Sequence, residues 1–177
     1  MTEDLFGKMK QDYIDHMKEF MGEYGQFGPM ITVFADNPQE EEKPAIIHIP
    51  IPPQFMKNNE TKDEFVNEMV PEMFAEIKER FKPYAVAWAA EAWIRNLGKD
   101  KNFEGDYKEL PKKEVMLISF QQKDANTGVV YNIKRNGKQV TPSGDIVDQI
   151  ELEEDTELGD LEGMEGRFSN LFSKFDD

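Results

Sequence analysis

The stretch that most constrains the fold runs from Tyr84 to Leu97, with the sequence YAVAWAAEAWIRNL. It holds both tryptophans and the densest run of small apolar residues in the chain. Pro83 precedes it and would remove a backbone hydrogen bond from a helix, and two faces of alternating residues follow. We therefore predict a strand at the centre of the core, with alanines that let a helix lie close. Continuation of the preceding helix is the alternative, because alanine is the best helix former.

Two amphipathic helices are predicted before this stretch. Residues 2–24 carry aromatic and methionine side chains every three or four positions, and Thr2 is placed to cap the first turn. Residues 61–82 open with Thr61 and Glu64, the spacing of a capping box. Pro71 lies inside this second pattern, so either the helix kinks there or a second helix starts with Pro71 in its opening turn.

Strands are predicted from alternating or β-branched runs bounded by turn residues, at 30–35, 45–51, 84–97, 114–123, 129–135 and 138–141. The first two form a hairpin whose second strand ends in prolines and should lie at a sheet edge. Asn136-Gly137 indicates a two-residue hairpin turn. Because short loops join consecutive strands, we predict an α+β fold: an antiparallel sheet of about five strands, packed against two helices on one face.

The negative charge is concentrated at the end of the chain. Residues 145–177 hold 12 acids and two bases, which is −10 of the total net charge of −15. Residues 145–165 have few large apolar side chains, so we expect them to be flexible. The predicted division is a core domain of residues 1–144 and an acidic tail of residues 145–177 that ends in a short amphipathic helix.

Composition and motifs exclude several kinds of site. There is no cysteine, and the two histidines, His16 and His48, lie in no catalytic arrangement or zinc motif. No phosphate-binding glycine loop is present, so neither a metal nor a cofactor is expected. The first residues lack the regions of a signal peptide, and no apolar run approaches the roughly 18 residues of a membrane helix. We expect a cytoplasmic protein, and an enzyme is the less favoured class.

Glu91 is the one catalytic candidate. A carboxylate in the middle of an Ala- and Trp-rich strand costs free energy unless it is paired or hydrogen-bonded. Burial would raise its pKa and suit it to acid–base chemistry. An ion pair, for example with Arg95, is the structural alternative.

Two further surfaces are candidates for binding. At the end of the tail four apolar residues recur at the spacing of one helix face, and we predict that they bind a protein partner: Phe168, Leu171, Phe172 and Phe175. Basic residues interleaved with aromatic ones suggest a single-stranded nucleic acid surface, centred on Lys112, Lys113, Lys134, Arg135 and Lys138. A solvated sheet face is the alternative, because acids interrupt this patch.

Two resemblances bear on these predictions. The segment from Glu91-Ala92-Trp93 across a polar loop to Lys113-Glu114-Val115-Met116 resembles a pattern in uncharacterised bacterial and phage proteins, which implies no transferable function. The acidic tail with aromatics at its end resembles the tails of bacterial and phage single-stranded-DNA-binding proteins, which implies recruitment of protein partners. Its apolar helix face and terminal Asp176-Asp177 depart from that pattern.

The sequence therefore favours a non-enzymatic binding or accessory protein that docks a protein partner through its aromatic-tipped tail. One alternative is a single-stranded-DNA-binding protein with an autoinhibitory tail, or an acidic mimic of DNA. A small enzyme that uses Glu91 is the other.

Overall fold

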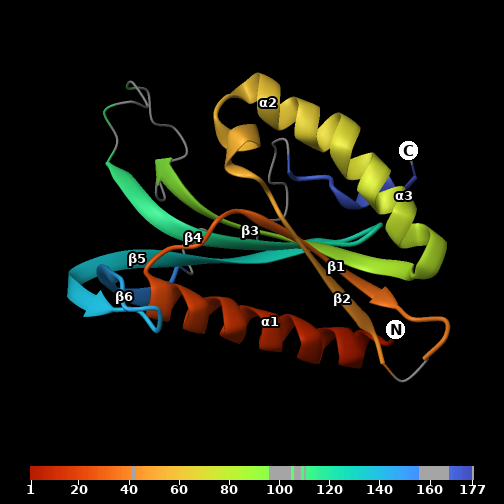
Figure 1. Ribbon diagram of the computed structural model, residues 1–177, viewed down its shortest axis with the longest axis horizontal. Coiled ribbons are helices and arrows are strands. Elements are labelled where there is room, and N and C mark those ends of the chain that lie inside the picture. Colours follow the sequence, from red (N-terminus) through yellow and green to blue (C-terminus); the bar gives the residue numbers. More distant parts are fainter. Residues whose placement is uncertain (41–42, 96–104, 106–108, 110, 156–167, 177) are drawn as a thin grey trace.

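Six antiparallel strands form one curled sheet with the order β2-β1-β3-β4-β5-β6 (Figure 1). The computed structural model describes residues 1–40, 43–95, 105, 109, 111–155 and 168–176. The strands are β1 (Met30–Asp36), β2 (Ala45–Pro50), β3 (Lys82–Arg95), β4 (Lys112–Gln121), β5 (Asn126–Val140) and β6 (Ile146–Glu154). The α+β class is confirmed, with six strands where about five were predicted. The edge position of β2 and the strand at the centre of the sheet, β3, are also confirmed.

The helices lie on opposite faces of the sheet (Figure 1). Helix α1 (Glu3–Tyr24) covers one face, and the segment of α2 (Asn59–Glu64) and α3 (Val70–Arg80) covers the other. The prediction that both helices share one face is wrong. Strand β1 is buried on both faces over its inner five residues, and β4 is nearly so, so each face needs its own cover.

Successive side chains of β3 point to opposite faces of the sheet, and they pack into two hydrophobic cores, one on each face. Ala85, Ala87 and Ala89 pack toward α1, whereas Val86 and Trp88 pack toward α3. The small side chains let α1 lie close to the sheet, as predicted. One residue departs from the expected faces: Tyr84 is an extra residue opposite β1, a β-bulge that turns its ring onto Phe6 of α1, with ring centroids 5.1 Å apart.

The helical segment before β3 starts earlier than predicted. Asn58, not Thr61, is the N-cap: its side chain accepts from the Thr61 amide at 2.9 Å, and the Thr61 hydroxyl accepts from the Asn58 amide. A π-helical turn, Phe65–Met69, then separates α2 from α3, and Pro71 lies in the opening turn of α3. The buried face of this segment is formed by residues that include Val66, Val70 and Phe74.

Strand β5 runs straight through Asn136-Gly137, so the predicted hairpin turn there is wrong. The two residues together oppose one residue of β6, as a β-bulge, and Gly137 takes a φ of 75°. The hairpin turn lies instead at residues 141–145, where the Thr141 amide donates to the Asp145 carbonyl. Residues 146–154, predicted as flexible tail, are strand β6, paired with β5 from Tyr131 to Val140.

None of the helices in the described part of the chain is long and apolar enough to cross a membrane.

Candidate functional site

The C-terminal segment 168–176 lies against the face of the sheet that α3 covers. Leu171 is fully buried and Phe175 is 6% exposed, while Phe168 and Phe172 are partly buried beside them. The Phe168 ring stacks on Trp88 with centroids 3.9 Å apart, and the Phe175 ring stacks on Phe74 at 4.0 Å. We call the surface formed by Trp88, Phe74 and Gln121 the tip groove.

Gln121, at the end of β4, binds the backbone of this segment. Its amide nitrogen donates to the Phe168 carbonyl and its amide oxygen accepts from the Leu171 amide, both at 2.6 Å. Lys78 of α3 donates to the Phe175 carbonyl at 2.8 Å. Gln121 is 1% exposed, and the sequence analysis missed it. Its one signal was a polar residue that ends an apolar strand.

All four predicted partner-binding residues are thus brought together, but on the chain's own core. They do not form a regular α-helix: a turn over residues 168–170 leads into a single 3-10 turn, η4 (Phe172–Phe175). A partner that bound these side chains would have to displace them from the tip groove. Of the acidic stretch predicted over 145–165, residues 156–165 lie outside the described residues.

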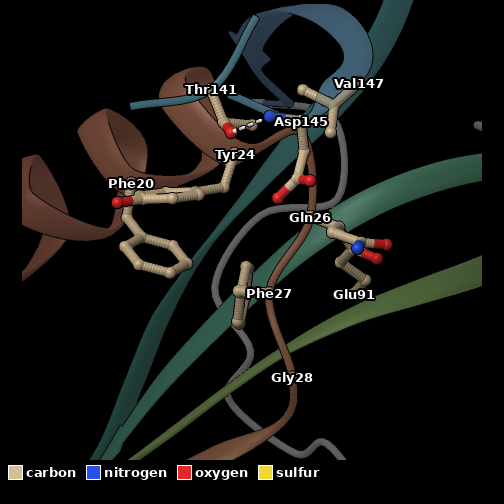
Figure 2. A pocket seen from close by; sticks show the side chains of 9 residues that line it. All are labelled: Phe20, Tyr24, Gln26, Phe27, Gly28, Glu91, Thr141, Asp145 and Val147. Atoms are coloured by element: carbon tan, nitrogen blue, oxygen red, sulfur yellow. Dashed lines mark hydrogen bonds between the residues drawn. The ribbon is translucent and has the colours of Figure 1, made fainter. Parts of the chain in front are cut away.

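Glu91 lines a hollow of about 560 Å³ at the opposite face of the sheet (Figure 2). The last turn of α1 provides Phe20 and Tyr24, the following loop provides Gln26, Phe27 and Gly28, and the β5–β6 turn region provides Thr141, Asp145 and Val147. Gly25 ends α1 with a φ of 71°, and this left-handed conformation directs the chain from the helix into the loop that lines the hollow.

The charge of Glu91 is only partly balanced. Burial raises the pKa of its carboxyl group, and Arg135 and a backbone hydrogen bond from Phe27 oppose that rise. Arg135 Nη2 lies 4.0 Å from Glu91 Oε1, whereas the same guanidinium donates to Glu114 through Nε at 3.0 and 3.1 Å. Glu91 Oε1 is buried without a hydrogen-bond partner. Arg135 is therefore the cation that stands beside Glu91 among the described side chains, and the side chain of Arg95, the partner suggested from the sequence, lies outside them.

The five basic residues proposed for nucleic acid do not form one surface. Lys112 and Arg135 lie on the α1 side of the sheet, and Lys113 and Lys134 lie on the other side, by strand register. Four of the five are paired with acids: Lys113 with Asp155, Lys134 with Glu153, Arg135 with Glu114, and Lys138 with Asp148. A phosphate backbone would have to compete with these carboxylates.

The two histidines flank a second hollow of about 310 Å³ beside the first. His48 Nδ1 lies 2.9 Å from the Thr32 hydroxyl, and that hydroxyl donates to the buried Tyr13 hydroxyl at 3.2 Å. Burial, followed by repulsion from His16, lowers the pKa of His48. Among the described residues no group of three or more His, Asp and Glu side chains is placed to hold a metal ion.

Comparison with known proteins assigns the chain to no class. No protein-family model matches the sequence, and no curated protein or solved structure matches it either. The site is therefore interpreted from its own geometry.

Proposed function

We propose that the protein is a non-enzymatic binding protein whose C-terminal aromatic segment exchanges between its own tip groove and a groove on a protein partner. One observation carries this proposal. Residues 168–176 bind the core as a short terminal segment, through two aromatic stacks and three hydrogen bonds to their backbone carbonyl and amide groups, without joining the sheet.

That mode of docking is how short linear motifs bind proteins. Aromatic anchors fill apolar pockets, and a few backbone hydrogen bonds fix the register. A short segment that packs on a sheet without joining its hydrogen-bond ladder opens at a lower free energy than the sheet itself. The stability of the docked state then determines what fraction of the molecules has a released segment. A partner binds only the released segment, so its apparent affinity falls as that fraction falls.

The test changes the two sides of the contact separately. Gln121→Leu removes two of the three hydrogen bonds from the groove side and leaves the segment intact. At roughly 1 kcal/mol each, their loss shifts the ratio of released to docked segment by about 30-fold. Affinity-tagged protein is incubated with lysate of the source cells, and each retained protein is quantified by mass spectrometry.

Under the proposal a specific partner is retained more strongly by Gln121→Leu and is lost from Phe172→Ala, which weakens the segment itself. Asn170→Asp, an exposed position in the same segment, is the matched control and should retain the partner at the wild-type level. Retention that is the same in all three variants would show that the segment serves only to close the core.

A further inference from the structure

The hollow beside Glu91 combines an aromatic wall with carboxylates. The rings of Phe20 and Tyr24 lie with centroids 4.5 Å apart, and Phe27 lines the hollow from the loop. Figure 2 shows these rings on one side, with the carboxylate of Asp145 and the side chain of Glu91 around the same space. Its volume of about 560 Å³ falls in the range of small-molecule sites, roughly 300–1,000 Å³.

The charge around this hollow is negative beyond what the local cations balance. Four carboxylates stand at this corner, those of Glu91, Glu114, Asp145 and Asp148, and in the described residues Arg135 and Lys138 are the cations paired with them. Arg135 also donates to the Gly25 carbonyl at 2.9 Å, so its donors are shared among several acceptors. Helix α1 ends here with no basic residue in its last turn, and its C-terminal dipole adds partial negative charge.

The Glu91 carboxylate at this hollow is incompletely hydrogen-bonded. Its Oε1 is buried without a hydrogen-bond partner, 4.0 Å from Arg135 Nη2, while the side chain as a whole remains 26% exposed. Asp145 accepts a hydrogen bond from Ser143 at 3.1 Å, which holds the turn that carries it. A ligand that completes this site must bring positive charge and must tolerate contact with aromatic faces.

We propose that this hollow binds a small alkylated ammonium ion, with its alkyl groups against Phe20, Tyr24 and Phe27 and its charge held by Glu91 and Asp145. Aromatic faces attract cations through the ring quadrupole, and weakly hydrated alkylated ammonium groups are the ligands that such walls recognise. The site lies on the α1 face of the sheet and does not depend on the C-terminal segment, which docks on the other face.

Choline is the probe, and 3,3-dimethyl-1-butanol is its neutral control, because this alcohol has the same shape with a carbon in place of the nitrogen. Binding to the full chain is measured by NMR titration, with the backbone amides of Gln26, Phe27 and Gly28 as reporters. We expect saturable binding of choline and an affinity for the alcohol at least tenfold lower.

Two variants locate the site. Glu91→Gln should weaken choline binding at least tenfold, whereas Asp12→Asn should not change it. Asp12 is exposed on α1 about 18 Å along the helix axis from Tyr24, and its substitution removes the same charge. If Glu91→Gln fails to fold, Asp145→Asn on the exposed turn takes its place with the same expected loss. Equal affinity for choline and the alcohol, equal affinity in Glu91→Gln and Asp12→Asn, or no saturable binding would each overturn the proposal.

Discussion

Tyr13 brings a hydroxyl group into the core between α1 and the sheet. It is 6% exposed, its ring meets Phe34 and Phe120 edge-on, and its oxygen accepts a hydrogen bond from Thr32. Burial raises its pKa to about 12, and the hydrogen bond from Thr32 opposes that rise. The free energy of unfolding should therefore depend on pH in the alkaline range, through the proton of Tyr13.

The sign of this coupling follows from proton binding. Between pH 10 and 12 the unfolded chain releases the Tyr13 proton and the folded chain keeps it, so the free energy of unfolding falls as pH rises. Two pKa units correspond to about 2.7 kcal/mol. Tyr13→Phe should remove much of this decline between pH 9 and 11.5, measured by urea unfolding. Tyr24→Phe, at the end of the same helix, controls for loss of a hydroxyl and should decline like the wild type.

Glu91 gives a prediction of the same kind at lower pH. Because burial raises its pKa in the folded state, its protonated form contributes stability that is present in acid and is lost as pH rises through the folded pKa. Arg135 and the Phe27 amide limit the rise, and Glu114 adds to it. Glu91→Gln should therefore gain stability relative to the wild type as pH rises from 4.5 to 7. A difference that does not change over this interval would mean that Glu91 is fully balanced by its neighbours.

At the scale of elements, the end of α1 depends on Gly25. Its φ of 71° is a left-handed conformation, and a Cβ there would lie 2.9 Å from the Asp148 carbonyl oxygen and 3.4 Å from Val147. Helix α1 and strand β6 therefore approach each other as closely as a backbone without a side chain permits. Gln139 of β5 also binds the end of α1, because its side-chain amide donates to the Gly22 carbonyl at 2.5 Å.

Two alanine substitutions in this turn should have opposite effects. Gly25→Ala should lower the free energy of unfolding by about 2 kcal/mol or more, because left-handed backbone costs alanine roughly 1–2 kcal/mol and the contact adds to it. Gly22→Ala lies within the helix, meets nothing within 4 Å, and should raise it by up to about 1 kcal/mol. Thermal unfolding of both variants measures the difference. A stable Gly25→Ala would mean that α1 and β6 can separate at little cost.

Local pattern predicted most elements and failed where one inserted residue changed the geometry. The stripe of α1, the edge strand β2 and the strand nature of β3 follow from periodicity and proline placement. The bulge at Tyr84, the π-helical turn before α3 and the bulge at Asn136-Gly137 do not, because each depends on the partner across the sheet or core. Asn-Gly has the chemistry of a hairpin turn, but pairing with β6 on both sides holds it inside a strand.

At the scale of the whole molecule, the sheet packs against helices on both faces. Its last strand, β6, was the hardest element to predict from the sequence. Strand β6 is acidic and mostly exposed, with a burial pattern too weak to stand out from flexible sequence. Its place is set by backbone pairing with β5, from Tyr131 with Glu154 to Val140 with Ile146. Spacing made Phe168 to Phe175 candidates. Trp88 and Gln121, which pack against them, are distant in sequence, and only the place of Gln121 at the end of an apolar strand set it apart.

Truncation should separate the roles of the two terminal parts. In a Trp93→Phe background, which leaves Trp88 as the single tryptophan, a chain that ends at residue 167 should keep its sheet. Its Trp88 emission should shift to longer wavelength, because Phe168 no longer covers the ring. A chain that ends at residue 144 also loses β6, with the partners of Lys134 and Lys138 and the backbone against which Gly25 packs.

That shorter chain should be unfolded or much less stable, because β5 becomes an uncovered edge and α1 loses its support at the C-terminal end. Circular dichroism, NMR dispersion and the emission of Trp88 report on the two truncations independently. A chain of residues 1–144 with the stability of the longer truncation would place the domain boundary at residue 144 and make β6 an accessory strand. Loss of folding only in the shorter chain would place β6 within the folding unit and leave the C-terminal segment as the separable part.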